Sequence, residues 1–352
     1  MLINRRNFLQ QSGGFGVYLA LDQLGLKSAP VTPTQSALKL TLQLDWKFNV
    51  QFAGVLLADY YGLYDQQRLE VEIQPWQPGV DLTERVATDP LVVSCAEQDV
   101  ILAAQAAGRP IRAIATMFQH SPLGLMSLPE HQIISLYDLV GKRVGVHQDS
   151  QKVMDLVMGF SQLSPNQIEV VEISYGEKYD KLLTGAIDAV QCYAVDEPIG
   201  FVIRTGIQPN VLNLSDYGYD AYVQTLFVHP SLLSQYPQAV HNFLQATFNG
   251  WELALSDIPK AAEIVVEHYA SPRGKYSDLE YQVESLHLVA DYILPEVDSV
   301  KIGQILPERW QTMSERLARY HLIETIPSLV DSVDLTLWRS QLNSASTTPG
   351  MA

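Results

Sequence analysis

Strand-like and helix-like segments alternate along this chain from residue 38 onward, and that alternation limits the fold more than any other feature. The stretch "LKLTLQLDW" at 38–46 alternates apolar and polar residues as a half-covered strand does, and "FAGVLLADYYGLYDQQ" at 52–67 carries apolar residues at helical spacing. The stretch "LEVEIQPW" at 69–76 is strand-like again. Repeated strand–helix–strand units predict mostly parallel sheets with helices on their faces.

The alternation comes in two blocks, which predicts two α/β units. The first block continues through "LVVSCAEQD" and "IRAIATMFQ", and a second block begins after Ser127 and closes with "YVQTLFVHP" at 222–230. From Ser231 to Trp338 the apolar residues stand three and four apart, which predicts helices. A chain of 352 residues is long enough to give each unit a core of its own.

Charge and cysteine content exclude several classes of function. The formal net charge is −16, which argues against nucleic acid and against anionic membrane surfaces, because both need basic patches. The two cysteines, Cys95 and Cys192, are too few for a disulfide framework or a cysteine-rich zinc site, and we expect both to be buried free thiols. The eight histidines do not cluster at ligand spacing, so the sequence predicts no metal site.

The first residues resemble a twin-arginine export signal. Arg5 and Arg6 are followed by Phe8 and Leu9 and then by a short apolar stretch that contains glycine. An amphipathic helix or a disordered tail is the alternative. We therefore expect residues 1–37 to be an export signal and linker, and the protein to be periplasmic or otherwise extracytoplasmic.

The ends of the predicted strands carry the most polar and aromatic loops. Ligands of open α/β sheets bind beyond the carboxyl ends of the strands, and this rule selects the loops at 45–49, 94–98, 118–121, 147–150 and 193–197. Together these loops predict a cleft between two lobes.

Four of these side chains belong to the first block. Trp46 offers a flat face for a ring, and Asp45 and Asn49 offer directional hydrogen bonds; the alternative is a core tryptophan with Asp45 capping the next helix. Glu97 stands at a helix start, where a carboxylate is favoured with or without a ligand.

The stretch "CYAVDEP" at 192–198 is the strongest single candidate. Pro198 suits the first turn of a helix, so that either Asp196 or Glu197 could cap that helix while the other contacts a ligand. Tyr193 could stack on a ring or donate a hydrogen bond. Adjacent carboxylates point in different directions, which disfavours an acid/base pair. Tyr222 lies in a tyrosine-rich loop that lines a cleft or simply covers the surface.

These motifs resemble the substrate-binding proteins of bacterial ABC importers, in the branch that binds thiamine-pyrimidine precursors. The resemblance rests on the order of "LQLDWKFNVQFAG", "VVSCAEQDVILAAQAAG", "DLVGKRVGV" and "GAIDAVQCYAVDEPIGF", and it covers about residues 38–320. It implies a type II periplasmic-binding-protein fold, in which two Rossmann-like lobes are joined by a two-strand hinge. The implied division is 38–120 with 231–340 for a discontinuous lobe 1, 121–230 for lobe 2, and 341–352 for a disordered tail.

The resemblance also implies a function and a set of contacts. Phe118 and Gln119 would face the cleft where the first crossover begins, and Glu197 would meet the ligand. The protein would be a monomer that captures a small nitrogen heterocycle, with a thiamine-precursor pyrimidine as the leading ligand, and would deliver it to an ABC permease membrane subunit. Flavins, and sulfonate- or nitrate-type anions, are the alternatives.

An enzyme branch of the same superfamily makes a pyrimidine phosphate with pyridoxal phosphate attached to a lysine. Alignment on "LAAQAAG" puts that lysine at Ala96 and its histidine partner at Val100, and the cysteine-rich run of that branch falls on 218–222, "GYDAY". Alanine cannot form a Schiff base and valine cannot move a proton. The sequence therefore favours a binding protein with no catalytic residues and no cofactor, although a scaffold protein that has lost transport would leave the same pattern.

Overall fold

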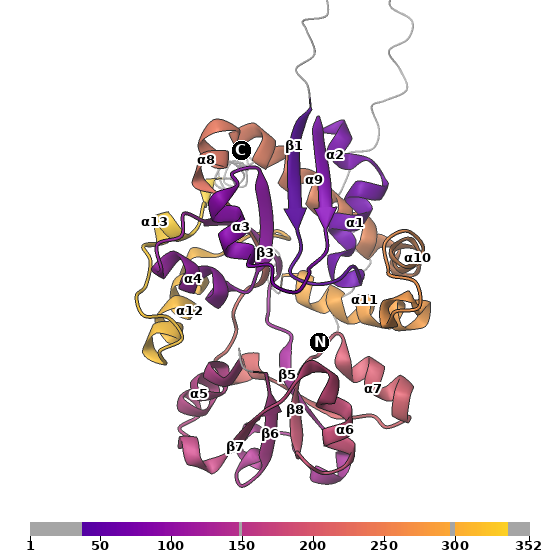
Figure 1. Cartoon of the computed structure of the whole chain (residues 1–352), viewed down its shortest axis with the longest axis vertical. Helices are drawn as coiled ribbons and strands as arrows, with labels where there is room; N and C mark the ends of the chain where they lie inside the picture. The colour runs from indigo at the N-terminus through magenta and orange to yellow at the C-terminus, as the bar shows by residue number, and fades with distance from the viewer. Residues whose placement is uncertain (1–36, 148–149, 296–299, 337–352) are drawn as a thin grey trace, which may run out of the picture.

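The protein is described here from a computed structural model, which covers residues 37–147, 150–295 and 300–336. Two five-stranded sheets stand one above the other in Figure 1, each within its own lobe. The strands of the first sheet are β1 Leu38–Gln43, β2 Leu69–Gln74, β3 Val92–Ala96, β4 Arg112–Phe118 and β10 Val223–Val228. Those of the second are β5 Leu123–Ser127, β6 Arg143–Val146, β7 Glu169–Glu172, β8 Ala189–Tyr193 and β9 Asn210–Asn213.

Strand order shows how the chain passes between the lobes. The first sheet has the order β2-β1-β3-β10-β4, with β1 parallel to β2 and β3, and with β10 antiparallel to its neighbours. The second sheet has the order β7-β6-β8-β5-β9. The chain leaves the first lobe after β4 and returns in β10, so two connections join the lobes. The predicted α/β fold of two lobes is confirmed.

One detail differs from the division implied by the sequence. Residues 223–228 would belong to the second lobe in that division, whereas β10 pairs with β3 and β4 of the first sheet. The pairing follows from composition, because every residue of "VQTLFV" is buried and a central strand buries both of its faces.

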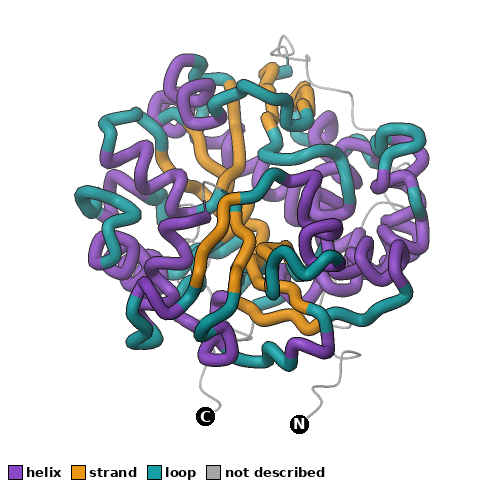
Figure 2. The backbone as a smooth tube through the Cα atoms, turned by 60° about the horizontal axis from the view of Figure 1, so that its bottom comes forward, coloured by secondary structure: helices purple, strands orange, loops and turns teal. Residues whose placement is uncertain are grey.

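Helices cover both sides of the strands (Figure 2). Around the first sheet lie α1 Ala53–Tyr60, α2 Leu63–Gln66, α3 Leu82–Thr88, α4 Gln98–Ala106, α8 Pro230–Gln235, α9 Pro237–Ser256, α10 Ile258–His268, α11 Leu279–Ile293, α12 Pro307–Arg319 and α13 Leu329–Ser332. Around the second lie α5 Gln151–Phe160, α6 Lys178–Leu183 and α7 Glu197–Thr205. No helix among the described residues is both long and apolar enough to cross a bilayer.

Close packing of α9 against α1 holds the later helices on the first lobe. A β-carbon on Gly250 would lie 2.0 Å from the carbonyl oxygen of Gly54, so the two helix backbones are in direct contact. The ring of Trp251, which is fully buried, fills the space beside Gly54. Glycine is needed at both positions because any side chain would push the helices apart.

Helix α12 touches both lobes. Trp310 of α12 accepts, at its carbonyl oxygen, a hydrogen bond of 3.0 Å from Gln98 of the first lobe. Farther along α12, Arg316 donates 3.1 Å to the carbonyl oxygen of Gly218 and covers the ring of Phe160 at 4.9 Å, both in the second lobe. We name this contact the C-terminal bridge (Trp310 and Arg316).

The expected export signal at 1–37 falls almost wholly, and the expected tail at 341–352 wholly, outside the described residues. The same holds for Gln148 and Asp149 of the loop after β6.

Candidate ligand-binding site between the lobes

Three carboxylates gather where strands of the first sheet end. Strands β1 and β3 are parallel neighbours, so their carboxyl ends meet at one edge, and Asp45 and Glu97 follow those ends. Asp99 lies in the first turn of α4, in the same "SCAEQD" motif. We call Asp45, Glu97 and Asp99 the acidic cluster. The buried thiol of Cys95 donates a hydrogen bond of 3.4 Å to Oδ1 of Asp45.

The members of the acidic cluster perturb one another. Burial, and secondly the negative charge of Glu97, raise the pKa of Asp45 to about 8. The same two causes, in the same order, raise the pKa of Asp99 to about 7, against hydrogen bonds from the Val100 amide and the Tyr219 hydroxyl. At neutral pH the carboxyl group of Asp45 is therefore mostly protonated and that of Asp99 about half protonated, and a nearby hydrogen-bond donor or positive charge would favour their ionised forms.

Tyr193 brings the second lobe to this cluster. It is the last residue of β8, and its hydroxyl donates a hydrogen bond of 2.7 Å to Oε1 of Glu97. Burial, and then the charge of Glu97, raise the pKa of the phenol well above its usual value, so Tyr193 stays protonated and acts as a donor. The structure thus brings together three of the predicted site residues, namely Asp45, Glu97 and Tyr193.

Trp46 lies next to the cluster along the chain and is half-buried. Its indole stacks on Trp76 with ring centroids 5.4 Å apart, and its Nε1 donates a hydrogen bond of 2.7 Å to the hydroxyl of Tyr276. The tryptophan is thus held by polar and aromatic contacts as well as by packing against the hydrophobic core of the first lobe.

The adjacent carboxylates Asp196 and Glu197 take different partners, and neither caps α7 through its side chain, contrary to prediction. Glu197 accepts 2.5 Å from Nζ of Lys178 and 2.7 Å from the amide of Tyr193, so both of its oxygens are bound within the second lobe. Burial alone would raise the pKa of Glu197, but the positive charges of Lys178 and Lys275 outweigh it and lower the value. A ligand that contacts Glu197 would share its oxygens with these partners.

The side chain of Asp196 instead contacts residues of the first lobe. Its carboxylate pairs with Lys275 at 2.7 Å and accepts hydrogen bonds from Tyr276 and Tyr281. Burial, and then the neighbouring charge of Glu197, raise the pKa of Asp196, and Lys275 works against that rise.

Two predicted residues have structural partners in the first lobe. Asn49 caps the 3₁₀ helix η2 Val50–Phe52, because its Oδ1 accepts 2.7 Å from the amide of Gln51. Phe118 is fully buried and stacks on Tyr292 with centroids 6.2 Å apart.

Gln119 and Tyr222 are likewise buried near the crossovers. Gln119 donates 3.3 Å to the carbonyl oxygen of Gln304. Tyr222 stacks on Trp310, and its hydroxyl accepts 3.0 Å from the amide of Leu306. Both side chains thus contact the segment 304–310.

Sequence reasoning missed Asp99 and the three partners of Asp196. Asp99 was detectable, since it stands two residues after Glu97 at a helix start. Lys275, Tyr276 and Tyr281 lie about eighty residues from Asp196 in a region with only a helical pattern. No local signal marked them.

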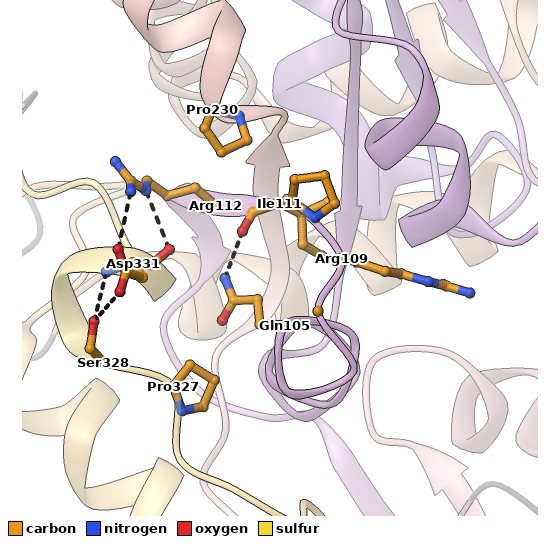
Figure 3. Close-up of a pocket in the computed structure, with 10 residues that line it drawn as sticks. Gln105, Arg109, Ile111, Arg112, Pro230, Pro327, Ser328 and Asp331 are labelled. Atoms are coloured by element: carbon orange, nitrogen blue, oxygen red, sulfur yellow. Dashed lines mark hydrogen bonds and ion pairs between the residues drawn. The ribbon is translucent and has the colours of Figure 1, made fainter.

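A separate hollow of about 330 Å³ lies on the first lobe between the start of β4 and α13 (Figure 3). It contains two arginines, but Arg112 pairs with Asp331 at 3.7 Å and Arg109 pairs with Asp81 at 2.8 Å. Figure 3 shows the Arg109 side chain extending away from Gln105. Both arginines of the hollow are therefore already engaged in ion pairs, so we place the candidate site at the contact between the lobes. Among the described residues, no group of three or more His, Cys, Asp or Glu side chains could hold a metal ion.

Two α/β lobes joined by two connections define the fold of the periplasmic binding proteins. The structure is similar to that of the aliphatic sulphonate binding protein SsuA from Escherichia coli, with a TM-score of 0.64 over 84% of this chain and 95% of that one, at 12% identity. Residues 49–262, more than half of the chain, match the family described as NMT1/THI5 like, and the chain belongs to that family.

Two curated relatives carry different names. One is a 4-amino-5-hydroxymethyl-2-methylpyrimidine phosphate synthase from Legionella pneumophila, 26% identical over 65% of this chain and 73% of that protein. The other is the riboflavin-binding protein RibY from Chloroflexus aurantiacus, 23% identical over 74% of each chain.

The residues of this chain do not fit pyridoxal phosphate at the position where the enzyme branch attaches it. Ala96, the last residue of β3, stands there with 2% of its surface exposed and has no amine. Val100 replaces the histidine. No chemical step through that cofactor follows from this site.

Proposed function

We propose that the protein is the exported solute-binding component of an ABC importer and that it holds a small nitrogen heterocycle between its lobes. The contact of Tyr193 with Glu97 carries the proposal, because it joins a strand end of each lobe at a group of hydrogen-bond acceptors. The family, the two-lobed fold and the names of both relatives support it, since a pyrimidine and a flavin are both nitrogen heterocycles.

The chemistry of the acidic cluster favours a ligand with amino or ring N–H groups. Carboxylates accept hydrogen bonds from such donors, and a partial positive charge on the ring would favour the ionised forms of Asp45 and Asp99. The half-buried indole of Trp46 offers a face for stacking. A thiamine-precursor pyrimidine is the leading candidate, followed by riboflavin. An anion is disfavoured because the negative charge of Glu97 stands at the site.

The enzyme alternative lacks its nucleophile. A pyrimidine synthase that works through a lysine-bound cofactor needs an amine where Ala96 stands. Incubation with pyridoxal phosphate followed by borohydride reduction and mass spectrometry tests this directly. Stoichiometric labelling of one lysine near the site would favour the enzyme.

Thermal-shift measurements on the purified protein test the binding proposal. The probes are 4-amino-5-hydroxymethyl-2-methylpyrimidine, riboflavin, an alkanesulfonate and nitrate. A ligand that binds only the folded protein raises Tm in proportion to the logarithm of its concentration. We expect the pyrimidine, or failing that riboflavin, to stabilise the protein. Stabilisation by an anion alone would contradict the heterocycle assignment.

A pair of variants locates the binding. Glu97→Gln keeps an acceptor for Tyr193 but removes the charge, and we expect at least a tenfold loss of affinity, or about 1.4 kcal/mol. Glu252→Gln makes the same change on the exposed face of α9 and should leave affinity unaltered. Equal affinity in the two variants would place the ligand elsewhere.

Export, the monomeric state and delivery to a permease are parts of the same proposal. Replacing Arg5 and Arg6 together by lysine should keep a fused reporter in the cytoplasm, because the twin-arginine signal is read through both guanidinium groups. Size-exclusion chromatography with light scattering should give the mass of one chain. A dimer mass would contradict the monomer.

A further inference from the structure

The loop between β8 and α7 inserts into the first lobe. Val195 is fully buried within the core of that lobe, and its carbonyl oxygen accepts 2.6 Å from Oγ of Ser285 in α11. On α7, Gly200 allows a close approach, since a β-carbon there would lie 3.3 Å from the ring of Tyr281. Figure 1 shows α7 of the lower lobe beneath α11 of the upper one.

Asp196 is the polar centre of this contact. Only 5% of its surface is exposed, and its carboxylate is surrounded by donors from the first lobe. Oδ2 lies 2.7 Å from Nζ of Lys275 and 3.1 Å from the hydroxyl of Tyr276, and Oδ1 accepts from the hydroxyl of Tyr281. We call Asp196, Lys275, Tyr276 and Tyr281 the latch. A buried carboxylate with three donors is stable only while the lobes touch, because separation removes all three together.

The latch continues to Trp46 through one hydroxyl. Nε1 of Trp46 can only donate, so the oxygen of Tyr276 must accept that hydrogen bond of 2.7 Å. An ionised Asp196 can only accept, so the single proton of Tyr276 must point at Oδ2 of Asp196. Both bonds of the Tyr276 hydroxyl are thereby fixed in direction, and the direction depends on Asp196.

We propose that Asp196 is a positioning residue that couples contact between the lobes to the orientation of the Trp46 ring. When the lobes meet, Asp196 orients the Tyr276 hydroxyl, and Tyr276 holds the indole in the plane that a bound ring would stack upon. The ring of Trp46 is thus oriented for stacking on a planar solute only when the second lobe is in contact with the first. The stacking role rests on the proposed function, whereas the coupling from Asp196 to Trp46 does not.

The indole N–H resonances of the ¹⁵N-labelled protein provide the test. The Trp46 signal is assigned by its loss in Trp46→Phe, and the Asp196→Asn variant follows. We expect the Trp46 signal to move upfield or broaden, because its hydrogen-bond acceptor is no longer held. An unchanged Trp46 signal in Asp196→Asn overturns the coupling.

Three further variants separate a positioning role from a structural one. Tyr276→Phe leaves the Lys275 and Tyr281 contacts of Asp196 in place, so it breaks only the link to Trp46 and should shift the same signal even if Asp196→Asn does not fold. Asp196→Glu keeps the charge, so its Trp46 signal should lie closer to the wild-type position than that of Asp196→Asn. Asp180→Asn, an exposed carboxylate on α6, should leave the Trp46 signal in place.

Affinity measurements with the pyrimidine and riboflavin distinguish a failure of the coupling between Asp196 and Trp46 from a failure of the proposed function. If Asp196→Asn moves the Trp46 signal while the wild-type protein binds neither probe, the coupling stands and the proposed function fails. If the wild-type protein binds a probe and Asp196→Asn weakens that binding at least fivefold together with the Trp46 shift, both stand. Unchanged affinity alongside a shifted signal overturns the role of Asp196 in preparing the stacking face.

Discussion

Replacing Asp45 by asparagine should stabilise the protein, and more so at high pH. The pKa of Asp45 is about 8 in the folded protein against an ordinary value of 3.8, because burial and the charge of Glu97 oppose ionisation. Between these two pH values the folded state holds a proton that the unfolded chain has released. Stability therefore falls as pH rises through that window, and asparagine has no proton to lose.

The size of the effect follows from the width of the window. One pKa unit corresponds to about 1.4 kcal/mol, so at pH 7 the wild-type side chain opposes folding by at most ~4 kcal/mol. Asp45 is half-buried and water reaches part of it, which reduces the expected gain to about 2 kcal/mol. At pH 5 the same reasoning leaves under ~1 kcal/mol. Asparagine also keeps an oxygen for the Cys95 thiol, so the local packing is retained.

Urea unfolding at pH 5 and pH 8 measures this difference. The control is Asp155→Asn, which removes a carboxylate from the exposed side of α5. We expect Asp45→Asn to gain free energy of unfolding at pH 8 well beyond its gain at pH 5, and Asp155→Asn to change little at either. A gain independent of pH, or a loss at both values, would refute the reasoning. Under the proposed function, the stabilised variant should also bind its solute more weakly, since it has lost an ionisable acceptor.

Three other predictions concern the contact between the lobes, the packing of helices and the thiols. Tyr193→Phe removes the hydrogen bond to Glu97, worth about 1.5–3 kcal/mol, and should increase the radius of gyration in small-angle X-ray scattering; an unchanged radius would mean that the bond does not hold the lobes together. Gly250→Ala should lower the free energy of unfolding by about 3 kcal/mol through the clash with α1, while Gly176→Ala, which meets nothing within 4 Å, serves as control; equal stability of the two variants would contradict the close packing. Both cysteines are free and buried, so a thiol reagent should label two thiols in denaturant and none in buffer; fast labelling of the native protein would argue against their burial.

The alternation of strands and helices was enough to predict two α/β units, because each element has a strong period of its own, whereas the two-lobed fold with its crossovers was implied by the family resemblance. The rule on strand ends also selected Asp45, Glu97 and Tyr193 correctly as neighbours. Their positions depend only on where β1, β3 and β8 end, which the apolar runs reveal.

The rest of the site depends on the direction in which side chains point, which the local sequence does not determine. Whether Asp196 or Glu197 points across the gap is decided by the backbone at Asp196, with φ −132° and ψ −79°, outside the regular helix and strand regions. Asn49 and Phe118 are polar and aromatic as a binding residue would be, yet one caps a short helix and the other fills the core. Residue type alone cannot separate these roles.

Because of the C-terminal bridge, the lobes are joined by different contacts on the two sides of the molecule. Figure 1 shows α12 and α5 on one side and α7 with α11 on the other. Helix α12 contacts Gln98 of the first lobe and Gly218 of the second, whereas on the other side the loop between β8 and α7, together with α7 itself, meets α11. If the lobes rotated about an axis near α12, the loop that carries Asp196 would move far, because it lies on the opposite side of the molecule. Under the proposed function, a solute would then enter and leave past α7.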